Sequence, residues 1–160
     1  MDIRRIISAC LCMLLTTAAF SRAQVNVTVN NNLVFGDVFP HVPRTVSKRD
    51  AGMAAEFHVT GPAGQKVTIQ FTLPTYMNMG GYSMQMIFNE TDCAMDSSLT
   101  QASKQSNPGY DNLDPWHAIT YSLGTNGLTI WLGGKVVPAI VQPAGNYQAD
   151  IVIRVDTTGN

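Results

Sequence analysis

Apolar and polar side chains alternate with a period of two over many short runs of this chain, from residue 24 to residue 156. A period of two places every second side chain on one face of a strand, so each run predicts a strand with one buried and one exposed face. The clearest runs are residues 25–29, 55–60, 67–73, 82–88, 119–123, 128–137 and 147–155. No helical periodicity competes with them after residue 24. We therefore expect an all-β fold, an antiparallel immunoglobulin-like β-sandwich of about seven or eight strands.

Glycine and proline divide these runs. Residues 61–64 read Gly-Pro-Ala-Gly, which predicts that runs 55–60 and 67–73 form a hairpin. The pair Gly133-Gly134 interrupts the run at 128–137, which predicts a bulge or bend. The alternation also predicts the core, formed by Phe57, Val59, Ile69, Phe71, Phe88, Ile119, Ile130, Tyr147, Ile151 and Ile153.

The first 23 residues predict a cleavable signal peptide. Arg4 and Arg5 precede an apolar run at residues 6–20, and Ser21-Arg22-Ala23 has the small-x-small pattern of a signal peptidase site. We expect cleavage after Ala23, leaving one domain at residues 24–160 in the periplasm or on the surface of a bacterium. The apolar run is shorter than the about 20 residues that cross a bilayer, so we expect no membrane span.

Composition and motifs exclude several classes of function. The net charge of −1 and the charged fraction of 13% provide no basic field for nucleic acid. The three histidines are scattered, and no serine lies in a Gly-x-Ser-x-Gly setting. After cleavage Cys93 is the last cysteine, so no disulfide can form within the domain, and we expect a buried thiol without a function. We expect neither an enzyme nor a metal or cofactor site.

The longest segment without strand periodicity is residues 89–116, which we expect to be a polar loop. Its aromatic residues Tyr110 and Trp116 are candidates for a ligand-stacking surface, whereas Trp131 has the alternation of a core residue.

Several short motifs, taken in order, resemble a known group of proteins. They are LVFGDV at residues 33–38, AEFHVTG at 55–61 followed by VTI at 67–69, and LGG at 132–134 leading to GNYQADI at 145–151. Together they resemble an uncharacterised family of exported bacterial β-sandwich domains. That family is similar to the spore-coat-U-like and fimbrial pilin subunits of chaperone–usher systems. The resemblance covers residues 25–155, and the cysteine pair of many pilins is missing.

The resemblance implies a structural or fimbrial surface subunit whose partners are like subunits, a periplasmic chaperone and an usher. Such subunits associate when an alternating segment of one chain completes the sheet of another. Val25, Val27 and Val29 have the required pattern, so we expect a sheet-completing strand here, used within its own molecule or donated to a neighbour. The alternative is a self-contained exported binding domain, with glycans as one class of ligand.

Overall fold

The computed structural model describes residues 24–98 and 104–158, so the expected signal peptide at residues 1–23 lies outside the described residues. The described residues form twelve strands. They are β1 (Asn26–Asn31), β2 (Arg44–Val46), β3 (Ala55–Thr60), β4 (Lys66–Thr72), β5 (Tyr76–Met79), β6 (Tyr82–Ile87), β7 (Cys93–Asp96), β8 (Tyr110–Leu113), β9 (Ile119–Ser122), β10 (Leu128–Leu132), β11 (Gly134–Val137) and β12 (Val152–Thr157).

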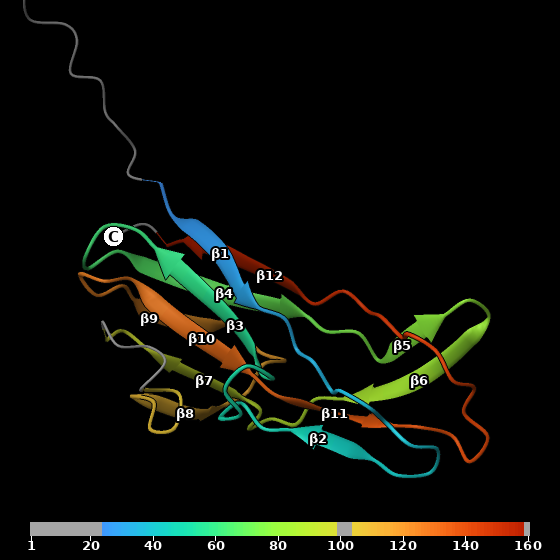
Figure 1. Cartoon of the computed structure of the whole chain (residues 1–160). Helices are drawn as coiled ribbons and strands as arrows, with labels where there is room; N and C mark the ends of the chain where they lie inside the picture. The colour runs from blue at the N-terminus through green and yellow to red at the C-terminus, as the bar shows by residue number, and fades with distance from the viewer. Residues whose placement is uncertain (1–23, 99–103, 159–160) are drawn as a thin grey trace, which may run out of the picture.

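The strands form three antiparallel sheets, so the expected all-β antiparallel sandwich is confirmed (Figure 1). A five-stranded sheet has the order β1-β3-β10-β7-β8, and a three-stranded sheet has the order β12-β4-β9. The third sheet, β2-β11-β6-β5, extends the molecule at the end away from the chain termini (Figure 1). The expected count of seven or eight strands is too low, because the run at 128–137 divides into β10 and β11 and because β2, β5, β7 and β8 lie outside the alternating runs.

The core lies between the five-stranded and three-stranded sheets. Phe57 of β3 and Phe71 of β4 meet across it with ring centroids 6.0 Å apart. Val59, Ile69 and Ile130 are fully buried, as the alternation predicts. Phe71, Ile119, Tyr147, Ile151 and Ile153 pack against the same core but remain half-buried.

Two sequence-based expectations are wrong. Strands β3 and β4 do not form a hairpin, because β3 pairs with β1 and β10 whereas β4 pairs with β12 and β9. The turn at residues 61–64 therefore carries the chain from one sheet to the other. Residues 89–116 are also not one loop, since β7 and β8 lie within them, and β7 is buried at all four positions.

The predicted bend at Gly133-Gly134 is present, and the chain passes from one sheet to another at this bend. Strand β10 ends at Leu132 in the five-stranded sheet, and β11 begins at Gly134 in the four-stranded sheet. A Cβ at Gly133 would lie 2.6 Å from the amide nitrogen of Lys48 and from the carbonyl oxygen of Val46, so only glycine allows this close approach. Among the residues described, no helix is long and apolar enough to cross a membrane.

Candidate functional site

The two sides of the sandwich differ. On one side, Tyr110 of β8 and Tyr121 of β9 bring the two sheets together, with ring centroids 5.1 Å apart. On the other side lie the edge strands β1 and β12, and two adjoining cavities follow this side. We call them together the edge groove.

The edge groove lies between two segments that connect strands. One wall is residues 31–40, which begin at the last residue of β1, and the other is residues 142–151, which precede β12. The larger cavity has a volume of about 750 Å³ and the smaller about 380 Å³. The cavities share five lining residues, Leu33, Phe35, Met77, Tyr147 and Gln148.

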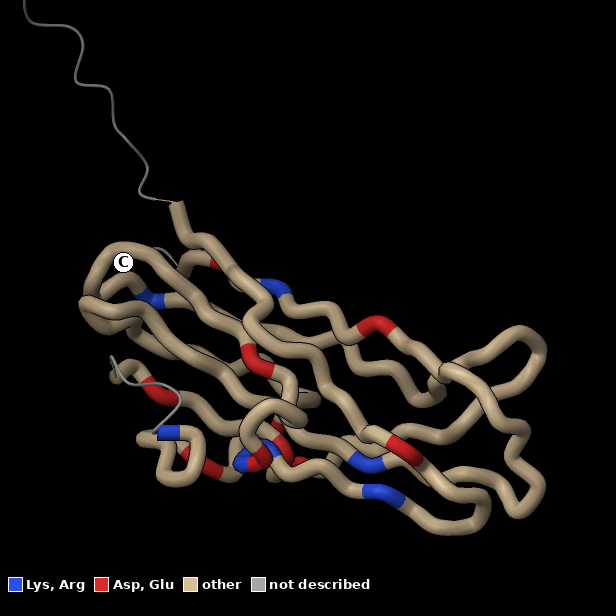
Figure 2. The backbone as a smooth tube through the Cα atoms, in the orientation of Figure 1, with Lys and Arg blue, Asp and Glu red and all other residues tan. Residues whose placement is uncertain are grey.

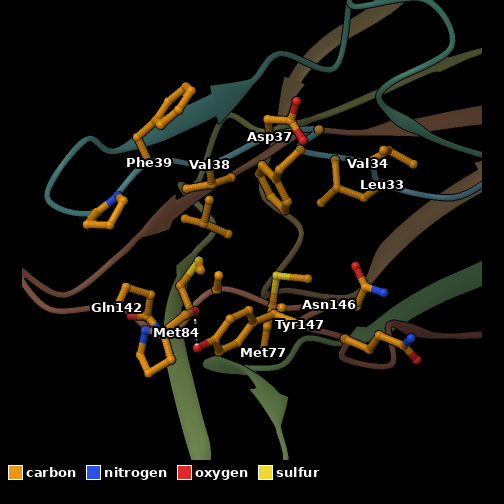
Figure 3. A pocket seen from close by; sticks show the side chains of 18 residues that line it. Leu33, Val34, Asp37, Val38, Phe39, Met77, Met84, Gln142, Asn146 and Tyr147 are labelled. Atoms are coloured by element: carbon orange, nitrogen blue, oxygen red, sulfur yellow. Dashed lines mark hydrogen bonds between the residues drawn. The ribbon is translucent and has the colours of Figure 1, made fainter.

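Apolar side chains from four strands form the base of the groove. They are Phe57 of β3, Met77 of β5, Met84 and Met86 of β6, and Val136 of β11. Figure 3 shows Val38 and Val34 on one side of the larger cavity, and Met84, Met77 and Tyr147 on the other. The carboxylates that line the groove are Asp37 and Asp150, and its lining contains no lysine or arginine. The groove therefore suits an uncharged, apolar occupant.

Specific contacts hold the walls in place. Asn78 and Gln148 exchange two backbone hydrogen bonds, of 2.8 and 3.0 Å, which fix the second wall to β5. Gly145 has a φ of 153° and lies so close to Met79 that a Cβ would overlap its sulfur. The first wall is fixed at Val34, whose amide donates to the carbonyl of Met53 at 2.8 Å.

Other backbone groups of both walls lack partners. In the described part of the chain, the amide N–H groups of residues 35–39 and 149–151 donate no backbone hydrogen bond. Unpaired amides beside an apolar groove are the arrangement that an added β-strand completes, because the strand supplies the missing acceptors and fills the groove with alternate side chains.

The segment with the three alternating valines forms β1, which pairs with β3 of its own chain in the register Val27 to Val59. Val25 and Val27 are half-buried against the core, whereas Val29, the last residue before a register shift, is 56% exposed. The strand thus completes its own sheet in this structure, and its outer edge has no partner strand among the described residues.

The two candidate aromatic residues pack against different ring partners. Tyr110 packs edge-on against Tyr121, and Trp116 packs edge-on against Phe88 with its indole N–H donating to the Phe88 carbonyl at 2.9 Å. Both are about half exposed. Trp131 is fully buried, as expected, and its indole N–H donates to a Glu56 carboxylate oxygen at 3.0 Å.

A buried polar cluster organises the segment between β7 and β8. Lys48 is 7% exposed, and its ammonium group donates to the carbonyl of Thr91, to Asn112 and to Asp111. Burial opposes ionisation of Asp111, but hydrogen bonds from Lys48, Asn112 and Arg49 outweigh it and lower the pKa of the carboxyl. Asp96 behaves in the same way, because the hydrogen bonds from Ser98 and Gly109 outweigh burial and lower its pKa. These contacts are structural, since each charged group is satisfied within the cluster.

The thiol is buried, and two of the histidines bond to neighbouring side chains. Burial raises the pKa of the Cys93 thiol to about 12, so the nucleophilic thiolate does not form at neutral pH. His117 bonds to Asp114, and His58 bonds to Thr129. Within residues 24–98 and 104–158, no three histidine, cysteine, aspartate or glutamate side chains could hold a metal ion together.

Sequence reasoning did not find the edge groove. The alternation at residues 147–155 predicts one continuous strand, whereas β12 begins at Val152 and residues 147–151 belong to a wall, and the two walls meet only because β1 and β12 are the edges of facing sheets. The sequence feature that could have indicated these walls is the proline and glycine content of both segments next to edge strands. No protein-family model matches this sequence, and no curated protein matches it either.

Proposed function

We propose that this chain is an exported, non-catalytic structural subunit that assembles by β-strand addition in the edge groove. The observation that carries the proposal is the set of unpaired amides at residues 35–39 and 149–151 on either side of an apolar base. An extended segment placed there gains backbone hydrogen bonds and buries alternate side chains in one step. The resemblance to fimbrial subunits supports the same class of function and gives a periplasmic chaperone and an usher as the partners of assembly.

The occupant is the N-terminal strand of a second copy. Residues 24–36 contain no charged side chain, which suits a groove that is lined by apolar groups and two carboxylates. Val25, Val27 and Val29 repeat at period two, as a segment that fills a groove must. Strand β1 has β3 as its only partner strand in the described structure, so it leaves one ladder when it is donated.

A disulfide that holds β1 on β3, and that can be reduced, tests whether β1 is donated to a second copy; we call it the lock. Asn26 and Thr60 lie opposite each other in the β1–β3 ladder, and both are exposed. In the chain that begins at Gln24, the double variant Asn26→Cys/Thr60→Cys should form a disulfide that holds β1 on its own sheet. Light scattering at increasing protein concentration should show assembly of the parent chain, none of the oxidised variant, and assembly again after reduction.

The single variant Asn26→Cys is the matched control and should assemble like the parent. Equal assembly of the oxidised and reduced double variants would show that β1 is not the donated strand. A parent chain that stays monomeric at every concentration, alone and with a synthetic peptide of residues 24–34, would overturn the proposal as a whole.

The second candidate function is that of a self-contained binding domain. Two observations favour it: β1 pairs within its own chain, and the larger cavity, of about 750 Å³, is within the size range of small-molecule sites. Its apolar lining and its Asn146 and Gln148 side chains suit a neutral ligand, with glycans as one class. A rise in the unfolding temperature with a neutral oligosaccharide, lost in a Tyr147→Ala variant while the lock has no effect on assembly, would favour this function.

A further inference from the structure

Three loops meet at the end of the molecule that lies away from the chain termini (Figure 1). They are residues 38–43 before β2, residues 138–142 after β11, and the turn between β5 and β6 at residues 79–82. We call this end the loop tip. It adjoins the edge groove, because Val38, Phe39, Pro40 and Gln142 also line the larger cavity.

The loop tip exposes large apolar side chains. Ile140 is 74% exposed, Val141 86%, Phe39 68% and Val42 56%. Tyr82, on the third loop, is also more than half exposed. Single exposed apolar residues are ordinary on a protein surface, but a group of five at one end marks a contact site.

Hydrogen bonds hold the three loops together. The amide of His41 donates to the carbonyl of Ala139 at 3.1 Å, which joins the first loop to the second. Gln142 accepts from the amide of Ala139 at 2.9 Å and donates to the carbonyl of Ser83 at 3.3 Å, which joins the second loop to the third. The apolar side chains are therefore presented on a fixed frame, and little ordering is needed when they meet a partner.

The loop tip also has no acidic side chain, lysine or arginine. Residues 38–43, 74–89 and 136–149 contain no Asp, Glu, Lys or Arg, and His41 is the one histidine of the three loops. Asp37, Arg44 and Lys135 lie at the base of the loops, and Figure 2 shows no Asp, Glu, Lys or Arg beyond them. Inserting this end into an apolar medium thus requires no carboxylate, ammonium or guanidinium group to lose its water, which is the largest cost of such a transfer.

We infer that the loop tip inserts into the surface of a lipid bilayer. Apolar side chains at the ends of neighbouring loops match a fluid surface that adapts to them, and a tyrosine beside them suits the headgroup level, where its ring is buried and its hydroxyl stays wet. The three ionic groups at the base sum to a single positive charge, so apolar contact rather than charge holds the protein on the membrane. The inference can be tested apart from the proposed assembly, because Ile140 and Val141 line neither cavity of the edge groove.

Vesicle flotation with the chain that begins at Gln24 tests the inference. Phosphatidylcholine vesicles should carry the protein upward at low and at high salt alike, because no ion pair is needed. The variant Ile140→Asp/Val141→Asp should lose partitioning by about tenfold or more, since each carboxylate must be dehydrated on insertion. The control Val152→Asp changes a similarly exposed valine on β12, far from the loop tip, and should float like the parent.

Far-ultraviolet circular dichroism of each variant separates lost binding from lost folding. Three outcomes would overturn the inference: a parent chain that stays in solution, binding that requires anionic lipid and disappears at high salt, or equal flotation of the Ile140/Val141 variant. A concentration-dependent dimer that the same double variant abolishes, with no vesicle binding, would instead make the loop tip an interface between copies.

Discussion

The ammonium nitrogen of Lys48 lies 2.8 Å from a carboxylate oxygen of Asp111, and the Lys48 side chain is only 8% exposed. This ion pair joins the turn after β2 to strand β8. The same ammonium group also bonds to Asn112 at 2.8 Å and to the carbonyl of Thr91. One buried cation thus holds together three segments that are distant in sequence.

Replacing Lys48 by Met should destabilise the fold although the new side chain is apolar and similar in length. The substitution removes the donor that bonds to the Thr91 carbonyl and to the Asn112 amide oxygen, and each buried unsatisfied group costs about 1–3 kcal/mol, whereas Asp111 keeps its bonds from Arg49 and Asn112. We expect a loss of at least about 2 kcal/mol in chemical denaturation, together with faster hydrogen exchange in β8. An unchanged unfolding midpoint would mean that water replaces the ammonium group without cost.

Asp96 should make stability depend on pH in the acid range. Its pKa is lowered in the folded protein, so the ionised form binds the Ser98 and Gly109 amides more strongly than the protonated form does. The stabilisation is complete above the ordinary pKa of about 3.8 and is lost as the pH falls through the lower folded value. An Asp96→Asn variant should be less stable by about 1–3 kcal/mol at neutral pH and should lose less stability between pH 5 and pH 2 than the parent. Thermal unfolding at several pH values measures both effects.

The bend between β10 and β11 should not tolerate a side chain. Gly133→Ala places a Cβ 2.6 Å from backbone atoms of Val46 and Lys48, which cannot move aside as a side chain can. We expect a loss of about 2–4 kcal/mol in the free energy of unfolding. Gly81→Ala is the matched control, because a Cβ there meets nothing within 4 Å, and its stability should stay near that of the parent.

The sequence predicted this bend, but it did not predict that the chain passes from the five-stranded to the four-stranded sheet there. Alternation reports which side chains are buried, as at Val59 and Ile69, yet it does not report which strand lies alongside. For the same reason the runs around residues 61–64 suggested a hairpin, although β3 and β4 belong to facing sheets. Adjacent residues show whether a strand has one buried face, but they do not show which other strand it pairs with.

Strand β7 escaped prediction because both of its faces are covered. Cys93 and Met95 face the core, and Ala94 and Asp96 are buried as well, so its sequence does not alternate. The sequence does not predict the edge groove for a related reason, since its walls come together only through the long-range order of β1 and β12. The loop tip was visible in the sequence only as uncharged residues between strands.

Cys93 should behave as an inert core residue. Its thiol is fully buried and its pKa is raised to about 12, so thiolate is scarce at pH 8. A thiol-reactive dye should therefore label the native protein only as fast as the fold opens, and should label it at once in denaturant. Immediate labelling under native conditions would show that the thiol is accessible.

Two valines of β1 allow a matched test of whether this strand completes its own sheet in the monomer. Val27 is half-buried against the core opposite Val59, whereas Val29, opposite Phe57, is 56% exposed. A carboxylate at position 27 must be dehydrated or must force the strand out of the sheet, so Val27→Asp should cost about 2–4 kcal/mol at neutral pH. Val29→Asp should cost less than about 1 kcal/mol, because its carboxylate stays in water. Chemical denaturation of the monomer, at concentrations below any assembly, measures the difference, and equal stability of the two variants would show that β1 does not pack on its own core in solution.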